Sequence, residues 1–186
     1  INIYLDLSKA FDTLDHKILL QKLEFYGITG IPLNLFENYL CNRKQFVEYD
    51  GCNSKTLNII FGVPQGSITG PHLFIVYIND IANASNKLKF LCYADDTPFS
   101  NNISYFGSVE HTHVLENNIN YELSKVNEWL KMNKLSMNKD KTKYMLFHKQ
   151  KKIIYPEISI DNVSIERVRS FNFLGIYLHE HMTWKV

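Results

Sequence analysis

The chain has 186 residues, a mass of 21.8 kDa and a formal net charge of +1 with neutral histidines. Hydrophobic residues make up 45% and charged residues 21%, which is an ordinary globular composition and argues against a disordered or fibrous chain. The longest clean apolar run, residues 73–78, is far shorter than the roughly 20 residues that a membrane helix needs. We therefore expect a globular fold without a membrane span.

The near-zero net charge gives no general sign of a nucleic-acid-binding protein. Three widely spaced cysteines argue against a disulfide scaffold and for a reducing compartment, so we expect an intracellular protein, cytoplasmic or nuclear. No signal peptide is visible, and the first residues already read as a strand. The chain is thus expected to be a piece of something longer.

Apolar and polar residues alternate over residues 1–6, which predicts a half-buried strand that ends at Asp6. Helical spacing predicts helices over residues 11–26, 32–40, 71–84 and 113–134. Further strands are expected over residues 43–50, 55–61, 87–93, 135–137, 142–147, 157–160, 163–165 and 171–178. Helices and strands mix without strict alternation, which favours an α+β fold.

Acidic residues stand at the ends of two expected strands: Asp6 after the first, and Asp95 with Asp96 after strand 87–93. Each alone is best explained by turn conformation. If the two strands are neighbours, however, three carboxylates converge and require cations. All-oxygen ligands suit Mg²⁺, and two such ions can support an in-line phosphoryl transfer. Because successive strand residues face opposite ways, Asp95 is the stronger candidate of the pair.

Three blocks in this order resemble the palm motifs of reverse transcriptases: YLDLSKAFD at 4–12, GVPQGS at 62–67 and YADD at 93–96. The resemblance is closest to non-LTR (LINE- or jockey-like) retrotransposons. LSMNKDKT at 135–142 resembles the next palm motif, and FLG at 173–175 resembles the primer grip. Together the motifs span essentially the whole chain.

The resemblance implies a right-hand polymerase architecture, in which helices back an antiparallel palm sheet and the fingers and thumb are incomplete. Palm would comprise residues 1–31 and 62–178, with a partial fingers region over about 32–61. Residues 179–186 would begin the connection to a missing thumb. The rest would belong to a larger retrotransposon polyprotein.

The resemblance also implies four groups of site residues. These are catalytic Asp6, Asp95, Asp96 and Lys141; metal-binding Asp6, Asp95, Asp96 and the backbone carbonyl of Leu7; nucleotide-binding Phe11, Gln65 and Gly66; and primer-grip Phe173, Leu174 and Gly175. Phe11 would exclude a 2′-hydroxyl and so select deoxynucleotides, although the same ring could be an ordinary core aromatic. Lys141 would lie near the leaving pyrophosphate, or could be a plain surface lysine. Asp12 is expected to cap or anchor the following helix.

The implied activity is RNA-directed DNA synthesis with two Mg²⁺ ions, or Mn²⁺ in their place. Its partners would be an RNA template, a DNA primer and deoxynucleoside triphosphates. Two alternatives stay open: another palm polymerase such as an RNA-dependent RNA polymerase, which Phe11 disfavours, and an inert or merely nucleic-acid-binding remnant of a decayed mobile element.

Two close histidine pairs, His111 with His113 and His179 with His181, could suggest a metal site. Neither pair has a nearby cysteine or a helical partner four residues away, so the spacing disfavours zinc.

Overall fold

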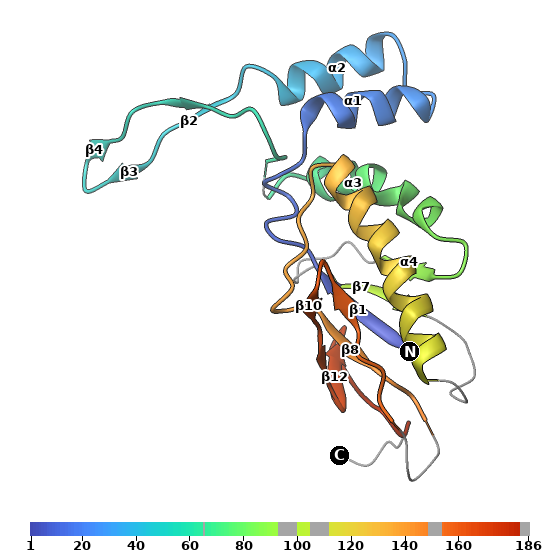
Figure 1. The fold of residues 1–186 in the computed structure, drawn as a ribbon. Coiled ribbons are helices and arrows are strands. Elements are labelled where there is room, and N and C mark those ends of the chain that lie inside the picture. The colour runs from blue at the N-terminus through green and yellow to red at the C-terminus, as the bar shows by residue number, and fades with distance from the viewer. Residues whose placement is uncertain (65, 93–99, 105–111, 149–153, 183–186) are drawn as a thin grey trace. The chain divides into compact units, whose positions relative to one another are not determined.

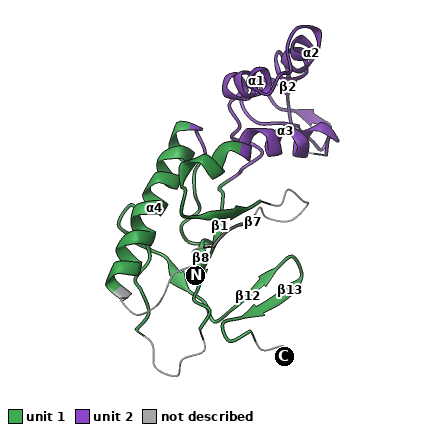
Figure 2. Cartoon of the chain, turned by 90° about the vertical axis from the view of Figure 1, so that its right-hand side faces the viewer, with its two compact units in different colours: residues 1–8, 80–132, 136–186 green, residues 9–79, 133–135 purple. Residues whose placement is uncertain are grey.

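The computed structural model describes residues 1–64, 66–92, 100–104, 112–148 and 154–182, so Gln65, Asp95 and Asp96 lie outside the described residues. Contacts divide the chain into two compact units (Figure 2). Unit 1 comprises residues 1–8, 80–132 and 136–186, and unit 2 comprises residues 9–79 and 133–135. None of the described helices has the length and hydropathy to cross a membrane.

A five-stranded sheet forms the centre of unit 1, in the order β11-β8-β1-β7-β6. Its strands are β1 (Asn2–Asp6), β6 (Lys89–Leu91), β7 (Ser100–Ser104), β8 (Lys143–Met145) and β11 (Glu166–Arg167). Neighbours run antiparallel except β8 and β11, which are parallel. The expected first strand is confirmed, but the expectation that it is only half buried was wrong, because it occupies the middle of the sheet.

Both faces of β1 are covered, because Ile3, Tyr4 and Leu5 are all buried although successive side chains point to opposite faces. The Tyr4 ring stacks on Phe171, with centroids 3.8 Å apart. Helix α4 (Thr112–Met132) lies along the sheet in Figure 1. Its buried apolar residues recur at helical spacing, which confirms the expected helix: Leu115, Ile119, Leu123, Val126 and Leu130.

Two small hairpins complete unit 1. They are β9 (Ser159–Ile160) with β10 (Val163–Ser164), and β12 (Ser170–Phe173) with β13 (Ile176–His179). Residues 171–178 therefore form a hairpin, and not the single strand expected. The 3₁₀ helix η1 (Asn79–Ala84) precedes β6 along the chain.

Unit 2 is built on three helices, α1 (His16–Phe25), α2 (Ile31–Leu40) and α3 (Thr69–Ile78). Helix α1 packs on both of the others. The Lys22 ammonium on α1 donates to the carbonyl oxygen of Tyr77 on α3 at 2.6 Å, and the Tyr77 hydroxyl donates to the carbonyl oxygen of Asn133 at 2.7 Å. The buried Tyr77 thus ties together segments far apart in the sequence.

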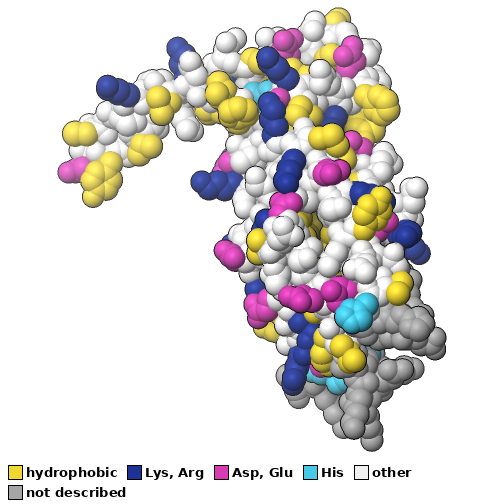
Figure 3. All heavy atoms as spheres, viewed as in Figure 1, with side chains coloured by type: hydrophobic (Ala, Val, Ile, Leu, Met, Phe, Trp, Pro, Cys, Tyr) yellow, Lys and Arg dark blue, Asp and Glu magenta, His cyan; other side chains and the backbone are white. Residues whose placement is uncertain are grey.

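Residues 44–58 form a long, exposed hairpin. Strand β2 (Lys44–Gln45) pairs with β5 (Leu57–Asn58), and β3 (Glu48–Tyr49) pairs with β4 (Cys52–Asn53). The two long strands expected here are therefore interrupted. Figure 3 shows hydrophobic side chains along this hairpin; the exposed ones include Phe46, Val47, Tyr49 and Leu57.

Helix α1 begins later than expected because its cap is Asp15 and not Asp12. The Asp15 carboxylate accepts hydrogen bonds from the backbone N–H groups of Lys17 and Ile18, at 2.9 and 3.1 Å. Asp12 instead lies in the preceding turn, where its N–H donates to the carbonyl oxygen of Lys9. The prediction that Asp12 caps the helix was wrong, and its alternative role as an anchor of the helix stays a prediction.

Two other predicted elements differ from the structure. The helix expected over residues 71–84 is α-helical only as far as Ile78, after which the tighter 3₁₀ helix η1 follows. Residues 135–137 contribute only a single bridge, between Met137 and Leu7, in place of a strand.

Candidate active site

Asp6 stands at the end of β1 and is held there by the loop over residues 138–142. Its backbone N–H donates to the Thr142 hydroxyl oxygen at 3.2 Å, and its carbonyl oxygen accepts the N–H of Asn138 at 2.8 Å. The Thr142 hydroxyl in turn donates to the carbonyl oxygen of Asn138 at 2.7 Å. Hydrogen bonds to the Asp6 backbone thus hold the first motif (residues 4–12) against the fourth motif (residues 135–142).

Burial and neighbouring polar groups shift the pKa of the Asp6 carboxyl in opposite directions. Burial raises the pKa of the Asp6 carboxyl, while the positive charge of Lys141 and a hydrogen bond from Asn138 lower it, and burial dominates. The nearby positive charge therefore does not fully offset the cost of burying the carboxylate. A bound cation would favour its ionised form. Lys141 itself is exposed.

The chain past Asp6 keeps a strand-like course. Leu7 is buried and forms an antiparallel bridge to Met137, and the N–H of Ser8 donates to the carbonyl oxygen of Ser136 at 2.8 Å. The backbone of Leu7, a candidate metal ligand, thus directly follows Asp6 on a rigid segment.

Asp95 and Asp96 lie outside the described residues, but both sides of their segment belong to the sheet. Ser100 pairs with Asp6, while Asn102 pairs with Tyr4 on one side and with Leu91 on the other. The direct neighbour of β1 is therefore β7, which follows the acidic pair; β6, which precedes it, is the next strand outward. The strand that precedes the acidic pair is therefore not a direct neighbour of the first strand, and the condition that the two strands adjoin is not met.

Residues 173–175, which resemble the primer grip, lie at a tight turn. Phe173 pairs with Ile176, leaving Leu174 and Gly175 as a two-residue loop with φ values of 51° and 82°. Two positive φ angles in a two-residue loop are typical of a type I′ turn. The Phe173 ring lies 6.1 Å from that of Tyr4, so this hairpin packs on β1 two residues before Asp6.

In unit 2, Phe11 is half-buried and its ring contacts Phe74, with centroids 4.9 Å apart. Its carbonyl oxygen accepts the N–H of Val63 at 2.9 Å. The contact with Phe74 agrees with the reading of Phe11 as a core aromatic and does not test its role as a gate. Gly66 has a φ of 77°, and a Cβ there would meet nothing within 4 Å.

Only a glycine fits the backbone conformation and the space at position 62 without strain. The φ of Gly62 is 79°, and a Cβ would lie 2.9 Å from the backbone of Asp12. Its N–H donates to the carbonyl oxygen of Leu14 at 2.8 Å, and its own carbonyl oxygen accepts from the buried His16 ring at 2.7 Å. The first two resembled motifs thus meet inside unit 2 through this glycine.

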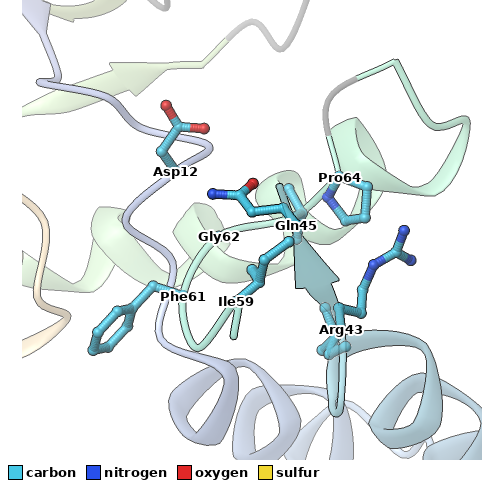
Figure 4. A pocket seen from close by; sticks show the side chains of 9 residues that line it. Asp12, Arg43, Gln45, Ile59, Phe61, Gly62 and Pro64 are labelled. Atoms are coloured by element: carbon cyan, nitrogen blue, oxygen red, sulfur yellow. The ribbon is translucent and has the colours of Figure 1, made fainter. Parts of the chain in front are cut away.

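A pocket of about 420 Å³ opens beside this junction. Figure 4 shows Asp12 and Arg43 on opposite sides of it, with Gln45 between them. Its other lining residues are Leu40, Ile59, Phe61, Gly62, Val63 and Pro64. The lining therefore combines apolar side chains with one acidic group, Asp12, and one basic group, Arg43.

Sequence reasoning missed Arg43 and Gln45 at this pocket, and it missed the support that Thr142 gives to Asp6. Thr142 could have been found, because it lies inside the fourth motif. The pocket residues could not, since the pocket forms where segments separated in the sequence meet.

Residues 1–178 match the protein family described as reverse transcriptase (RNA-dependent DNA polymerase). The chain belongs to this family. Its curated relatives include the "RNA-directed DNA polymerase from mobile element jockey" of Drosophila funebris, 27% identical over 189 residues, and the "Probable RNA-directed DNA polymerase from transposon X-element" of Drosophila melanogaster, 25% identical over 187 residues.

Another relative is the "Probable RNA-directed DNA polymerase from transposon BS" of Drosophila melanogaster, 26% identical over 196 residues. Each of these matches covers 98% of this chain but 20% of the relative. The chain therefore spans about a fifth of the length of the relatives it matches. The mixed sheet and helices agree with the polymerase palm that the family implies.

Proposed function

We propose that the chain is the palm segment of an RNA-directed DNA polymerase that copies a non-LTR retrotransposon. The observation that carries this proposal is the position of Asp6. It ends the central strand of the sheet, is anchored to the fourth motif, and pairs through its backbone with Ser100 immediately after the segment of Asp95 and Asp96.

The donor set fits two divalent cations, for which we propose Mg²⁺, with Mn²⁺ as a substitute. Asp6, Asp95, Asp96 and the carbonyl oxygen of Leu7 would hold them, and hard oxygen ligands suit these ions. The desolvated Asp6 carboxyl gives the proposal its physical support, because a cation compensates the charge that burial disfavours. Bound there, the ions would activate the primer hydroxyl and neutralise charge on the departing pyrophosphate.

The chain's own residues would position the reactants. The primer 3′-hydroxyl attacks the α-phosphate of a deoxynucleotide and pyrophosphate leaves, while Lys141 offers positive charge or a proton to the leaving group. Gln65 and Gly66 would contact the incoming nucleotide, and Phe11 would exclude a 2′-hydroxyl. The template is read by base pairing, so the protein needs only backbone contacts to the RNA template and DNA primer.

The hairpin of β12 and β13 would hold the primer end. Leu174 has a positive φ where an Asn would be relaxed, and it is 47% exposed. A strained, exposed leucine at such a turn is best explained by a contact outside the chain. Together with Phe173 and Gly175 it forms the proposed primer grip.

The same proposal divides the chain into palm over residues 1–31 and 62–178, partial fingers over about 32–61, and the start of a connection to the thumb from 179. It places the parent polyprotein inside the cell, in the cytoplasm or nucleus.

Primer extension on an RNA template by the parent protein tests the proposal. We expect deoxynucleotide incorporation that depends on Mg²⁺ or Mn²⁺ and is abolished by Asp95→Asn. Equal activity of the Asp95→Asn variant would refute the site. Preference for ribonucleotides would indicate an RNA polymerase, and an inactive parent protein that still binds primer–template would indicate a remnant.

A further inference from the structure

Three potential metal ligands meet in unit 1, away from the proposed polymerase site. They are His148, which follows β8, and Glu180 and His181, which follow β13; their donor atoms all lie within 4.8 Å of one another. The backbone holds the two segments together, since the N–H of His148 donates to the carbonyl oxygen of Glu180 at 3.3 Å.

Glu180 is a nearly buried carboxylate that is already oriented. Its side chain is 5% exposed, and one oxygen, Oε2, accepts from the Arg167 guanidinium at 2.7 Å. Arg167 is itself fixed over the Tyr155 ring, 3.7 Å from its centroid. The other oxygen, Oε1, lies 3.8 Å from Nε2 of His181. Ligand carboxylates in metal sites are commonly held in this way, with an outer hydrogen bond to one oxygen.

The two histidines present nitrogen atoms to this carboxylate. Nδ1 of His181 lies 3.3 Å from the carbonyl oxygen of His148, and because a carbonyl only accepts, that nitrogen carries the proton. In the neutral ring, Nε2 then has a free lone pair on the side of Glu180. The side chain of His148 is 7% exposed, and its Nε2 lies 4.0 Å from Glu180 Oε2.

These separations are wider than a bound metal requires. Ligands about 2.0–2.1 Å from a tetrahedral zinc ion are roughly 3.3 Å from one another, whereas these donor atoms lie within 4.8 Å of one another, so side-chain shifts of up to about 1.5 Å would close the site. Two imidazoles and one carboxylate suit zinc, with the fourth position left for water. We propose that His148, Glu180 and His181 bind one Zn²⁺ ion.

The ion would join the end of β8 to the end of β13. It would thereby stabilise the hairpin whose loop carries Leu174 and Gly175. The sequence alone disfavours zinc because only histidines close together along the chain were considered. His148 lies 33 positions from His181 and was therefore not considered as its partner.

Zinc titration by calorimetry, in excess Mg²⁺ to occupy the aspartate site, tests the proposal on the purified chain. We expect one ion per chain at micromolar affinity or tighter, weakened at least tenfold by His181→Gln and by Glu180→Gln. His181→Gln is the primary variant because its side chain is 47% exposed and should not disturb folding. His72→Gln on the exposed surface of α3 is the matched control and should bind as the wild type does.

Two further readouts distinguish a specific zinc site from loose metal binding elsewhere on the chain. Co²⁺ bound at the site should give the visible absorption of a tetrahedral ion, and saturating zinc should raise the melting temperature by about 5 °C or more. Absence of saturable binding would overturn the proposal. Binding that survives both variants would also overturn it, pointing to the free cysteines Cys41, Cys52 and Cys92. No readout depends on polymerase activity, so the two proposals can fail separately.

Discussion

The ring of Phe11 serves packing in any case, since it contacts Phe74 in the core of unit 2. Its proposed second role is to exclude the 2′-hydroxyl of a ribonucleotide. The two roles predict different consequences when the ring is shortened, because lost packing lowers stability and an opened gate changes selectivity.

We expect Phe11→Val in the parent protein to raise the ratio of ribonucleotide to deoxynucleotide kcat/KM by about tenfold or more, the size of effect that a steric pocket provides. Single-nucleotide incorporation kinetics measure the ratio. Phe74→Leu is the matched control, because it loosens the same contact without touching the gate, and its ratio should stay unchanged. An equal change in both variants would show that packing alone is at work.

Asp15 is the residue that decides where α1 starts. It caps the helix and pairs with the Lys134 ammonium, within unit 2. We expect Asp15→Ala to lower the free energy of unfolding by about 1–2 kcal/mol through loss of the cap. Asp12→Ala, at the exposed position that the sequence suggested as the cap, should cost less than about 0.5 kcal/mol. Urea denaturation measures both, and a reversed order would contradict the observed cap.

The ionisation of Asp15 should make the stability of the fold depend on pH. Burial works to raise the pKa of Asp15, but its hydrogen bonds from Lys134 and the backbone, with the charge of Lys134, lower it overall. A folded-state pKa below the ordinary value of about 3.9 stabilises the fold above that pH, and this contribution is lost as the pH falls through the folded pKa. The stability gap between wild type and Asp15→Asn should therefore shrink in acid. A gap that grows below pH 4 would contradict the direction of the shift.

Among the elements, the hairpin of β12 and β13 combines a strained turn with a fixed base. Phe171 and Phe173 anchor it on Tyr4, while Leu174 takes a φ of 51°. Asn adopts the positive φ of that position in a type I′ turn with less strain than Leu does.

We expect Leu174→Asn to raise the free energy of unfolding by about 0.5–1 kcal/mol while weakening use of the primer, seen as a higher KM for primer–template. Val163→Asn, on the exposed strand β10 of the same unit, is the control and should leave that KM unchanged. If Leu174→Asn is both more stable and fully active, the hairpin has no part in holding the primer.

Elements with a strong periodic pattern were predictable, and those set by distant partners were not. β1 and α4 follow from local hydrophobic spacing. The start of α1 did not, because Asp12 and Asp15 are equally good caps by residue type. In the structure the backbone N–H of Asp12 donates to the carbonyl oxygen of Lys9, and the backbone of Gly62 lies close to that of Asp12. The interrupted pairing of residues 44–58 leaves most of that hairpin exposed, so no buried face fixes its register.

Across the whole molecule, the sequence predicted that Asp6 ends a strand, but not which residues support it there. The motifs located Asp6 and Lys141, and the structure brings the charge of Lys141 to Asp6. The sequence could not show that β7 lies between β1 and β6, because strand order depends on pairing between distant segments. For the same reason the sequence could not predict that His148 and Glu180 lie close together.

The central claim is that Asp6 and Asp95 act on the same metal ions. Single-turnover incorporation of one deoxynucleotide by the parent protein, with Asp6→Asn, Asp95→Asn and the double variant, tests it most directly. We expect each single variant to be slower by about a thousandfold or more and the double variant to be hardly slower still, since residues that act as one unit are not additive. Asp140→Asn, an exposed neighbour of Lys141, should stay within about threefold of wild type. Near-normal incorporation by Asp6→Asn, or fully multiplicative losses in the double variant, would contradict the account.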